Sequence, residues 1–524
     1  QEKSTGQIRS TRTNGEGYYT IPQLSPGVYD VTVKAQGFKA TTRSGISLEI
    51  AQTARVDLSL QVGQVQEQVV VHDNAPILQT ENASMSQLIG QQAVLDLPLN
   101  GRKFTSLTTL VPGTVSGGTQ SLMNSTAIHV NGMRNSATAF SIDGVSTVSQ
   151  IYDGVPLTPA PDAIMEFKIN SNNMSAEYGQ GGAAVEVQLR SGTNDWHGGA
   201  YEFLRNDKFD AKNFFATSSP PLRQNQFGAL LGGPVIKNRT LFFLDYEGTL
   251  IRSSKTVNDV VPTEAERGGD FSALNKKLTD PFSGVIIPGN RIQPSMLSPQ
   301  ALYFLQFLPQ PNTPAGTYVQ NLASTSNTHQ FDIRLDHYFS PHDQITGSYS
   351  YQTISSFSPG SLPANGGLGA DLSFHRAGIN EIHTFSPTIV NEFRAGYFHD
   401  FSTQTPQGLG TDHAGKAGIG GLAQTSAEAP GFPQLSISGY TGINGNTYYP
   451  ITTSENTYEL RDYITWVKGS HTVKGGIYLR QYRVGAYNVA YSRGVFNFTG
   501  AYSGDGAADF LMGVPHIASR SFPR

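Results

Sequence analysis

The stretch Phe331-Asp332-Ile333-Arg334-Leu335-Asp336 decides the fold, because apolar and polar side chains alternate strictly along it. Side chains that alternate in this way point to opposite faces of a β-strand. Two later runs repeat the pattern: Ile345, Tyr349 and Tyr351 alternate with Gln344, Thr346, Ser348 and Gln352, and Val473, Ile477 and Leu479 alternate with Lys474, Tyr478 and Arg480. Strands with one apolar and one polar face occur in both soluble sandwiches and transmembrane barrels.

The lengths of the connections between these strands favour the barrel. Very short turns are expected at Asn238, 340–343, 386–388 and 468–471, and they alternate with long connections at 207–222, 251–326, 355–372 and 401–453. Outer-membrane barrels have short turns at one rim and long loops at the other, whereas a sandwich has no reason to place every long loop at one end. Charged residues such as Arg334 and Glu392 would then line a watery lumen, and the opposite face would meet lipid.

The composition agrees with this interpretation and excludes several function classes. The 524 residues suggest about three domains, and only 15% of them are charged while 10% are aromatic. The net charge is -4 and no basic run is present, so nucleic acid is not an expected partner. The chain contains no cysteine and no apolar run long enough for a membrane helix, so any membrane must be crossed by strands.

The chain is predicted to be mainly β and to divide into three parts: a small β-sandwich (1–61), a plug domain (62–192) and a partial transmembrane antiparallel β-barrel (193–524). The first part resembles the carboxypeptidase regulatory-like domain through Gly15-Glu16-Gly17-Tyr18-Tyr19, Leu24-Ser25-Pro26-Gly27-Val28-Tyr29 and Ala35-Gln36-Gly37-Phe38. The opening strand of that family is expected to be missing before Gln1. A helix is expected at 86–95 in the second part.

The second part resembles the plug of TonB-dependent receptors at several ordered points. The matching runs are Leu97-Pro98-Leu99-Asn100-Gly101-Arg102, Val130-Asn131-Gly132-Met133-Arg134, Phe140-Ser141-Ile142-Asp143-Gly144-Val145 and Ala176-Glu177-Tyr178-Gly179. The resemblance makes Asn100, Gly101, Arg102, Asn131, Gly132, Asp143 and Gly144 the plug-motif residues. The polar, glycine-rich composition of this second part predicts that it folds in the concavity of the barrel sheet.

The third part is similar to the Oar-like TonB-dependent receptors. The matching runs include Ser191-Gly192-Thr193-Asn194, Glu202-Phe203-Leu204-Arg205-Asn206, Phe242-Phe243-Leu244-Asp245-Tyr246-Glu247-Gly248, Gly269-Asp270-Phe271-Ser272 and Pro288-Gly289-Asn290-Arg291-Ile292. This resemblance implies a barrel of roughly twenty-two strands, a size at which the lumen is plugged. About ten strands can be counted, so the sheet should remain open and the chain is expected to be truncated at both ends.

The sequence contains no evidence for catalysis. It lacks a His-Glu-x-x-His metal motif, a Gly-x-Ser-x-Gly elbow and a phosphate loop. The histidines are scattered, and the resemblance of the first part is to an accessory sandwich and not to a peptidase. The chain is therefore predicted not to be an enzyme, with no catalytic residues, no metal site and no cofactor.

One short segment is a candidate for energy coupling. Glu67, Val69, Val70 and Val71 lie between the first two parts in a β-prone run, where the resembled family carries its TonB box. Such a segment can add as a strand to the sheet edge of a partner. The alternative is that it is simply the first strand of the plug.

The resemblance implies a receptor in the outer membrane of a Gram-negative bacterium that takes up a substrate with energy from the TonB system. The expected partners are a TonB-type periplasmic energy-coupling protein, outer-membrane lipid, and a substrate that could be a carbohydrate or a peptide. The alternative is a surface adhesive or carbohydrate-binding β protein without transport. Loop aromatics such as Tyr303, Phe304 and Phe307 could stack on sugars or could equally pack the loop itself.

Overall fold

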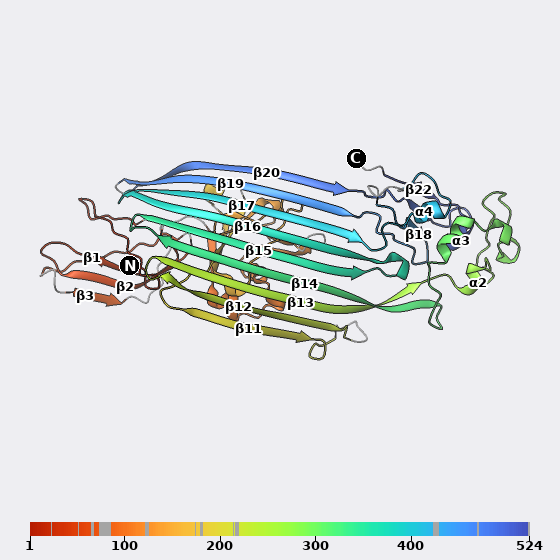
Figure 1. The fold of residues 1–524 in the computed structure, drawn as a ribbon, viewed down its shortest axis with the longest axis horizontal. Coiled ribbons are helices and arrows are strands. Elements are labelled where there is room, and N and C mark those ends of the chain that lie inside the picture. The colour runs from red at the N-terminus through yellow and green to blue at the C-terminus, as the bar shows by residue number, and fades with distance from the viewer. Residues whose placement is uncertain are drawn as a thin grey trace.

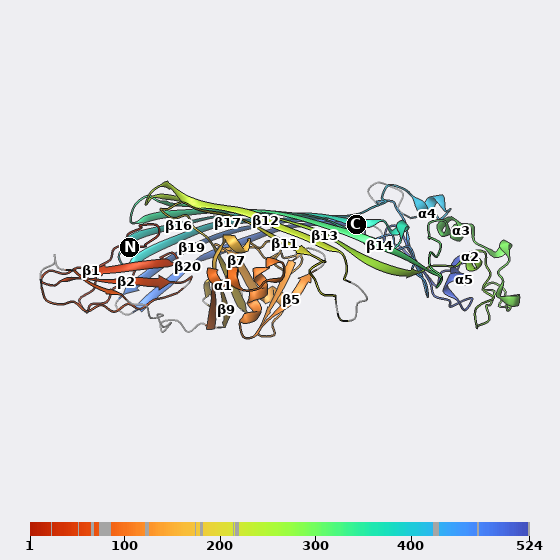
Figure 2. The same ribbon diagram turned by 90° about the horizontal axis from the view of Figure 1, so that it is seen from below.

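A computed structural model of the chain describes residues 1–21, 24–50, 52–63, 68–72, 85–120, 125–172, 174, 176–178, 182–212, 214, 219–422, 429–468 and 471–521. Its largest feature is a long curved sheet with a small sheet at one end and a cap of loops and short helices at the other (Figure 1). A third group of strands lies on the concave side of the long sheet (Figure 2). No helix in the described part of the chain is long and apolar enough to cross a membrane.

The small sheet at the N-terminal end has three strands in the order β1-β2-β3. Antiparallel β1 (Gly27–Val33) and β2 (Ala40–Leu48) are followed by β3 (Gln68–His72), which pairs parallel to β2 from Ala40↔Gln68 to Ser44↔His72. The segment Val69 to Val71 therefore extends the N-terminal sheet. The alternative that this segment is the first strand of the plug does not hold, because its ladder partner is β2 of the N-terminal sheet.

The central group, which we call the plug segment (residues 85–189), contains a five-stranded sheet in the order β4-β9-β10-β7-β8 and the hairpin β5-β6. Its apolar core includes Phe104, Phe140 and Phe167, which contact one another edge-on or tilted. The bounds are β4 (Met85–Gly90), α1 (Gln91–Asp96), β5 (Thr114–Gln120), β6 (Ser125–Val130), β7 (Thr138–Ile142), β8 (Val145–Ser146), β9 (Ile164–Asn172) and β10 (Ala183–Leu189).

The prediction of a helix at 86–95 is correct only for its second half. Residues Met85–Gly90 form strand β4, and α1 begins at Gln91. Strand β4 pairs antiparallel with β9, for example Gln87↔Ile169. Pairing with a distant strand has here overridden the helical pattern of the local sequence.

The long sheet has nine antiparallel strands that are paired almost entirely in chain order, and among the described residues β11 and β20 form its two edges. The prediction of one open, curved sheet is therefore confirmed, with nine strands in place of about ten. The bounds are β11 (His197–Asn206), β12 (Leu222–Ile236), β13 (Thr240–Val260), β14 (Thr317–Tyr338), β15 (Asp343–Pro359), β16 (Gly367–Ser386), β17 (Ile389–Pro406), β19 (Ile451–Lys468) and β20 (His471–Asn488).

Three of the expected long loops, 251–326, 355–372 and 401–453, are shorter than predicted because the strands continue into them. Strands β13 and β14 stay paired as far as Val260↔Thr317, so the connection expected at 251–326 spans only 261–316. Strands β15 and β16 stay paired as far as Pro359↔Gly367. These extensions lie beyond the apolar band described below, where strict alternation is not required. The sequence pattern therefore predicted strands that were too short at these ends.

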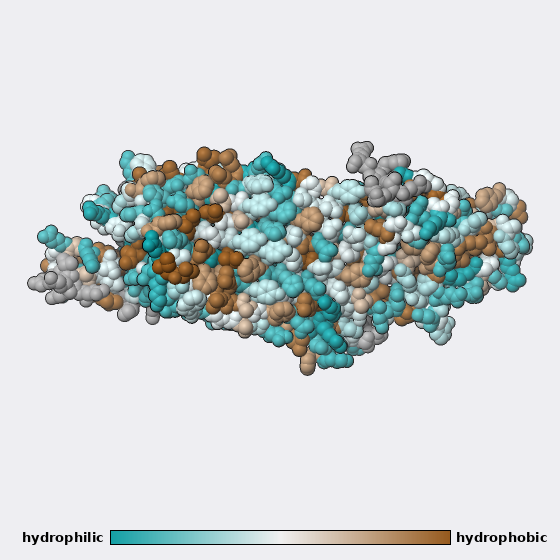
Figure 3. Space-filling view, viewed as in Figure 1, coloured by the Kyte–Doolittle hydropathy of each residue, from teal (hydrophilic) through white to brown (hydrophobic). Residues whose placement is uncertain are grey.

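Alternation along the strands sorts the two faces as predicted. Asp332, Arg334 and Asp336 are buried on the concave face, whereas Leu335 is 45% exposed on the convex face. The convex face carries two rows of aromatic and histidine rings. The upper row, nearer the long connections, includes His375, and the lower row, nearer the short turns, includes Phe385. Roughly 33 Å of strand separates these two residues on β16, which corresponds to about 25 Å of bilayer at a tilt of about 40°. Figure 3 shows apolar residues gathered over this part of the convex face.

The cap at the other end is built from the connections 261–316, 360–366 and 407–450 and from residues 489–521 after β20, which share one apolar core. It contains the sheet β18-β21-β22, helix α3 (Pro299–Leu305) and helix α5 (Gly506–Leu511). Phe304 is fully buried, and the Phe307 ring lies 4.9 Å from that of Phe432. These loop aromatics pack the cap itself, which decides the alternative left open by the sequence. The remaining bounds are α2 (Glu264–Arg267), α4 (His413–Lys416), β18 (Gln434–Ile437), β21 (Val495–Phe498) and β22 (Ile517–Ser519).

We expect that Leu335→Arg destabilises the sheet in a bilayer by about 2–4 kcal/mol, because the arginine would lie near the midplane of the lipid. The matched control is Ala323→Arg on the same strand and face, beyond the apolar band, where the cost should be below about 1 kcal/mol. The measurement is the free energy of unfolding in urea for the protein folded into lipid vesicles. Equal costs at the two positions would contradict the placement of the band.

Candidate functional site

The contact between the plug segment and the concave face centres on Asp143. It lies in the turn between β7 and β8 with φ +45°, followed by Gly144 at φ +78°, and this tight turn presents its carboxylate to the sheet. Its Oδ1 accepts hydrogen bonds from the Leu189 amide at 3.0 Å and from Arg334 Nη1 at 3.3 Å. Its Oδ2 lies 3.6 Å from Nη2 of Arg376, a side chain with no exposed surface.

The neighbouring Gly144 is favoured by its positive φ, at which a side chain would be strained, and it also packs closely against the sheet. A Cβ at Gly144 would lie 2.2 Å from Nη1 of Arg394 on β17, so a side chain there would move the flexible end of that arginine. The plug motif Asp143-Gly144 thus faces three arginines of the sheet, one each on β14, β16 and β17. The expectation that Asp143 faces inward-pointing strand residues is confirmed.

Arg102 makes a second contact with the concave face. Gly101 and Arg102 both have positive φ, 71° and 52°, which turns the Arg102 side chain toward β11 and β13. Its guanidinium pairs with Asp162 of the plug segment and lies 3.7 Å from Glu247 of β13. It also covers the ring of Phe203 at 4.2 Å. The side chain of Asn100 lies outside the described residues.

Asn131 and Gly132 have a different place. They form a turn after β6 with φ values of 51° and 73°. The Asn131 amide donates from Nδ2 to the Ser171 carbonyl at 2.9 Å, and its backbone N–H donates to the Gly113 carbonyl at 2.7 Å. All of these contacts lie within the plug segment, so the structure gives this pair a part in the plug's own packing.

A third contact was not found from the sequence. Glu455 of β19 accepts from Ser149 Oγ at 3.2 Å and from the Gln150 amide at 2.9 Å, so it binds the plug turn that follows β8. Val145 fits against Gly378 and Gly396, where a Cβ would come within 2.9 Å of it. Glu455 lies buried on the concave face of β19, and only the register of β19 shows that it meets this turn.

A further contact joins the N-terminal sheet to the plug segment. Just after β2, the Ile50 N–H donates to Glu166 Oε1, and the Ile50 carbonyl accepts from Lys168 Nζ at 3.3 Å. Both side chains lie on β9 and are buried. Burial raises the pKa of Glu166 to about 7 and lowers the pKa of Lys168 below its ordinary value of 10.5. Burial also raises the pKa of Glu186, which faces Lys168 across the β9–β10 ladder.

The candidate coupling segment is partly described. Glu67 lies outside the described residues, and so does the side chain of Val71. Val69 and Val70 lie on β3, at the edge of the N-terminal sheet, and the Val70 side chain is 47% exposed. One edge of β3 is occupied by β2. The role of Glu67, Val69, Val70 and Val71 in binding a partner stays a prediction.

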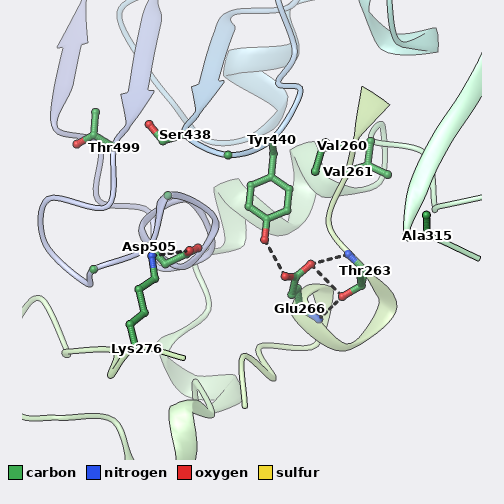
Figure 4. A pocket seen from close by; sticks show the side chains of 14 residues that line it. Val260, Val261, Thr263, Glu266, Lys276, Ala315, Ser438, Tyr440, Thr499 and Asp505 are labelled. Carbon is green, nitrogen blue, oxygen red and sulfur yellow. Dashed lines mark hydrogen bonds and ion pairs between the residues drawn. The ribbon is translucent and has the colours of Figure 1, made fainter. Parts of the chain in front are cut away.

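The cap contains a pocket of about 480 Å³ (Figure 4). Tyr440 and Glu266 point toward each other across it, and the tyrosine hydroxyl donates to Glu266 Oε1 at 2.7 Å. On the opposite wall, Lys276 Nζ lies 3.1 Å from Asp505 Oδ2. The other lining residues are small or short: Val260, Val261, Thr263, Ala315, Gly316, Ser438, Gly439, Thr499, Gly504 and Gly506.

Two family models match the chain. Residues 188–524 match the outer membrane beta barrel domain, and residues 1–61 match the carboxypeptidase regulatory-like domain. A curated relative, the TonB-dependent transporter Oar of Myxococcus xanthus, is 26% identical over 298 residues. That match covers 53% of this chain but only 27% of the relative, so the chain spans about a quarter of its length.

Solved structures that are similar to this chain include the outer membrane transporter YddB from Escherichia coli, with 9% identity and a TM-score of 0.47 over 77% of this chain and 48% of that one. Another is the ferric-catecholate import receptor Fiu from E. coli K12, with 11% identity and a TM-score of 0.40 over 78% of this chain and 61% of that one.

We expect Asp143→Asn to weaken the contact between the plug segment and the sheet by about 1–3 kcal/mol, because buried guanidinium groups lose their charged acceptor. Asp153→Asn is the matched control, since Asp153 also has positive φ (49°) but is exposed. The chain has no cysteine, so thiol labelling of a single Ala184→Cys reporter in urea can measure opening of the plug. If both variants open at the same urea concentration as the parent, Asp143 contributes nothing to the contact.

We also expect the folded plug segment to lose stability as the pH rises. Burial raises the pKa of Glu166 in the folded state, although the hydrogen bond from the Ile50 N–H lowers it, so folding binds a proton. The contribution is complete below about pH 4.5 and is lost as the pH rises through about 7. Thermal unfolding between pH 5 and 8 should therefore show a steeper fall for the parent than for Glu166→Gln, while Glu186 accounts for the dependence that remains. Identical slopes would contradict the assignment.

Proposed function

The chain belongs to the outer membrane beta barrel family, and we propose that it is part of a TonB-dependent receptor that takes up a substrate across the Gram-negative outer membrane. The proposal rests chiefly on the plug segment, which covers the polar concave face of the sheet through ion pairs at Arg102 and Asp143. A closed passage of this kind needs energy to open it. The similarity to the TonB-dependent transporter Oar supports the same interpretation.

The energy would reach the plug through the N-terminal sheet. We place the TonB-type partner at the free edge of β3, where a strand can be added by main-chain hydrogen bonds. A pull on β3 would act on β2 through their parallel ladder. The end of β2 leads directly to Ile50, which holds Glu166 and Lys168 of β9. The pull is thus delivered to a central strand of the plug sheet.

The substrate would first meet the cap, at the opposite end of the strands from the N-terminal sheet. The pocket in the cap offers hydroxyl groups, two carboxylates and one ammonium group, a set that suits a carbohydrate or a peptide. No catalytic role is proposed for it. The second candidate function is that of a surface adhesin. The compact core of the cap supports it, because a folded cap can bind a polymer without import.

The test compares Val69→Pro, Val70→Pro and Val70→Ala in cells. Adjacent residues of a strand direct their N–H groups to opposite edges, so one proline removes a donor to β2 and the other removes a donor at the free edge. We expect at least one proline variant to abolish uptake at normal surface level, while Val70→Ala retains most of it. The measurement is substrate accumulation, with surface level checked by immunoblot.

Normal uptake by both well-expressed proline variants would show that β3 is only a structural strand. An absence of uptake in the parent, together with binding of a polymer by the cap, would favour the adhesin.

A further inference from the structure

Two arginines lie directly opposite each other on the convex face of the sheet. Arg223 of β12 and Arg252 of β13 are cross-strand partners in the register. Their neighbours Gln224 and Ile251 are paired on the concave side, so both arginines point outward, and both are exposed. Like charges that face each other across a ladder destabilise it unless something lies between or above them.

No carboxylate compensates this pair among the described residues. Arg252 donates from Nη1 to the Asn327 side chain at 2.7 Å and to the Ile251 carbonyl at 2.8 Å, both neutral acceptors. The nearest acidic residue along the chain from Arg223, Asp210, is paired with Arg205. The arginines thus form a local excess of positive charge on an outward face.

The position of the pair relative to the apolar band indicates what can neutralise it. On the same two strands, Phe227 and Tyr246 lie below it, with ring centroids 6.3 Å apart, and Tyr246 shares a hydrogen bond of 2.9 Å with His329. Arg252 lies four residues beyond Gly248, the partner of Phe227, or roughly 13 Å farther along the strand. At a tilt of about 40° this is about 10 Å above the ring.

At that height the anionic groups are the phosphates of the glycolipid that forms the outer leaflet. We propose that Arg223 and Arg252 form a binding site for a phosphate group of this glycolipid, with Asn327 as a further polar contact. A guanidinium pair suits phosphate because each arginine can donate two parallel hydrogen bonds. The glucosamine headgroup would lie beside Tyr246 and His329, and the acyl chains would cover the apolar band below, at Leu231 and Leu244.

This site does not depend on transport, since it requires only that the sheet stands in the outer membrane. It fixes the height of the β12–β13 hairpin relative to the lipid. The same hairpin carries Glu247, which contacts Arg102 of the plug segment from the other face. The lipid would therefore hold the part of the wall against which the plug rests.

The test uses the full chain purified in detergent and the probe lipid A with two phosphates, with binding followed by native mass spectrometry. We expect Arg252→Gln to weaken binding about tenfold and the double variant Arg223→Gln/Arg252→Gln about a hundredfold. The matched control, Arg205→Gln/Lys255→Gln, also removes two positive charges from β11 and β13, but from the concave side of the sheet. It should bind lipid A as the parent does.

Two further arms identify the source of the phosphate. Lipid A without phosphates should bind the parent as weakly as intact lipid A binds the double variant. Inorganic phosphate at millimolar concentration should not displace lipid A. Retention of lipid A by the double variant, equal binding of the phosphate-free lipid, an equal loss in the control variant, or displacement by inorganic phosphate would each overturn the proposal. Because all variants are on exposed residues, unchanged thermal unfolding in detergent confirms that they fold.

Discussion

The structure depends on one long antiparallel sheet whose two faces meet different solvents. Inside a bilayer the backbone groups must be paired within the protein, and a sheet satisfies this only where strand follows strand without a gap. The nine strands do so in chain order, with short turns at one rim and long connections at the other. Once the convex face is apolar, alternation forces polar side chains onto the concave face, and that face must be covered or hydrated.

The plug segment covers it by matching charge with charge. The carboxylates and guanidinium groups of the concave face that meet the plug segment are buried, and burial of an unpaired charge is costly. The plug supplies Asp143 against Arg334 and Arg376, and Arg102 against Glu247. Such pairs contribute little net stability beside an apolar core, but removal of either partner is costly, so they specify one seating of the plug.

The two ends of the sheet divide the remaining tasks. At the cap, three connections and the residues after β20 build one apolar core, and a pocket remains between their polar surfaces. At the other end, the N-terminal sheet holds β9 of the plug through the backbone of Ile50. The proposed passage therefore runs between the folded cap and a plug segment that is held by the N-terminal sheet at the other end.

Local pattern was enough for the strands of the wall and for several turns. The alternation around Arg334 predicted the face of each side chain, because a strand has a period of two whatever lies beside it. The resemblance singled out Asp143-Gly144 and Gly101-Arg102, and the structure places both motifs at backbone positions with positive φ that contact the sheet. The sequence could not place what depends on pairing between distant segments. Strand β4 lies where a helix was expected, β3 joins β2, and Glu455 meets the plug turn only through the register of β19, since each of these contacts is made by residues far apart in the chain.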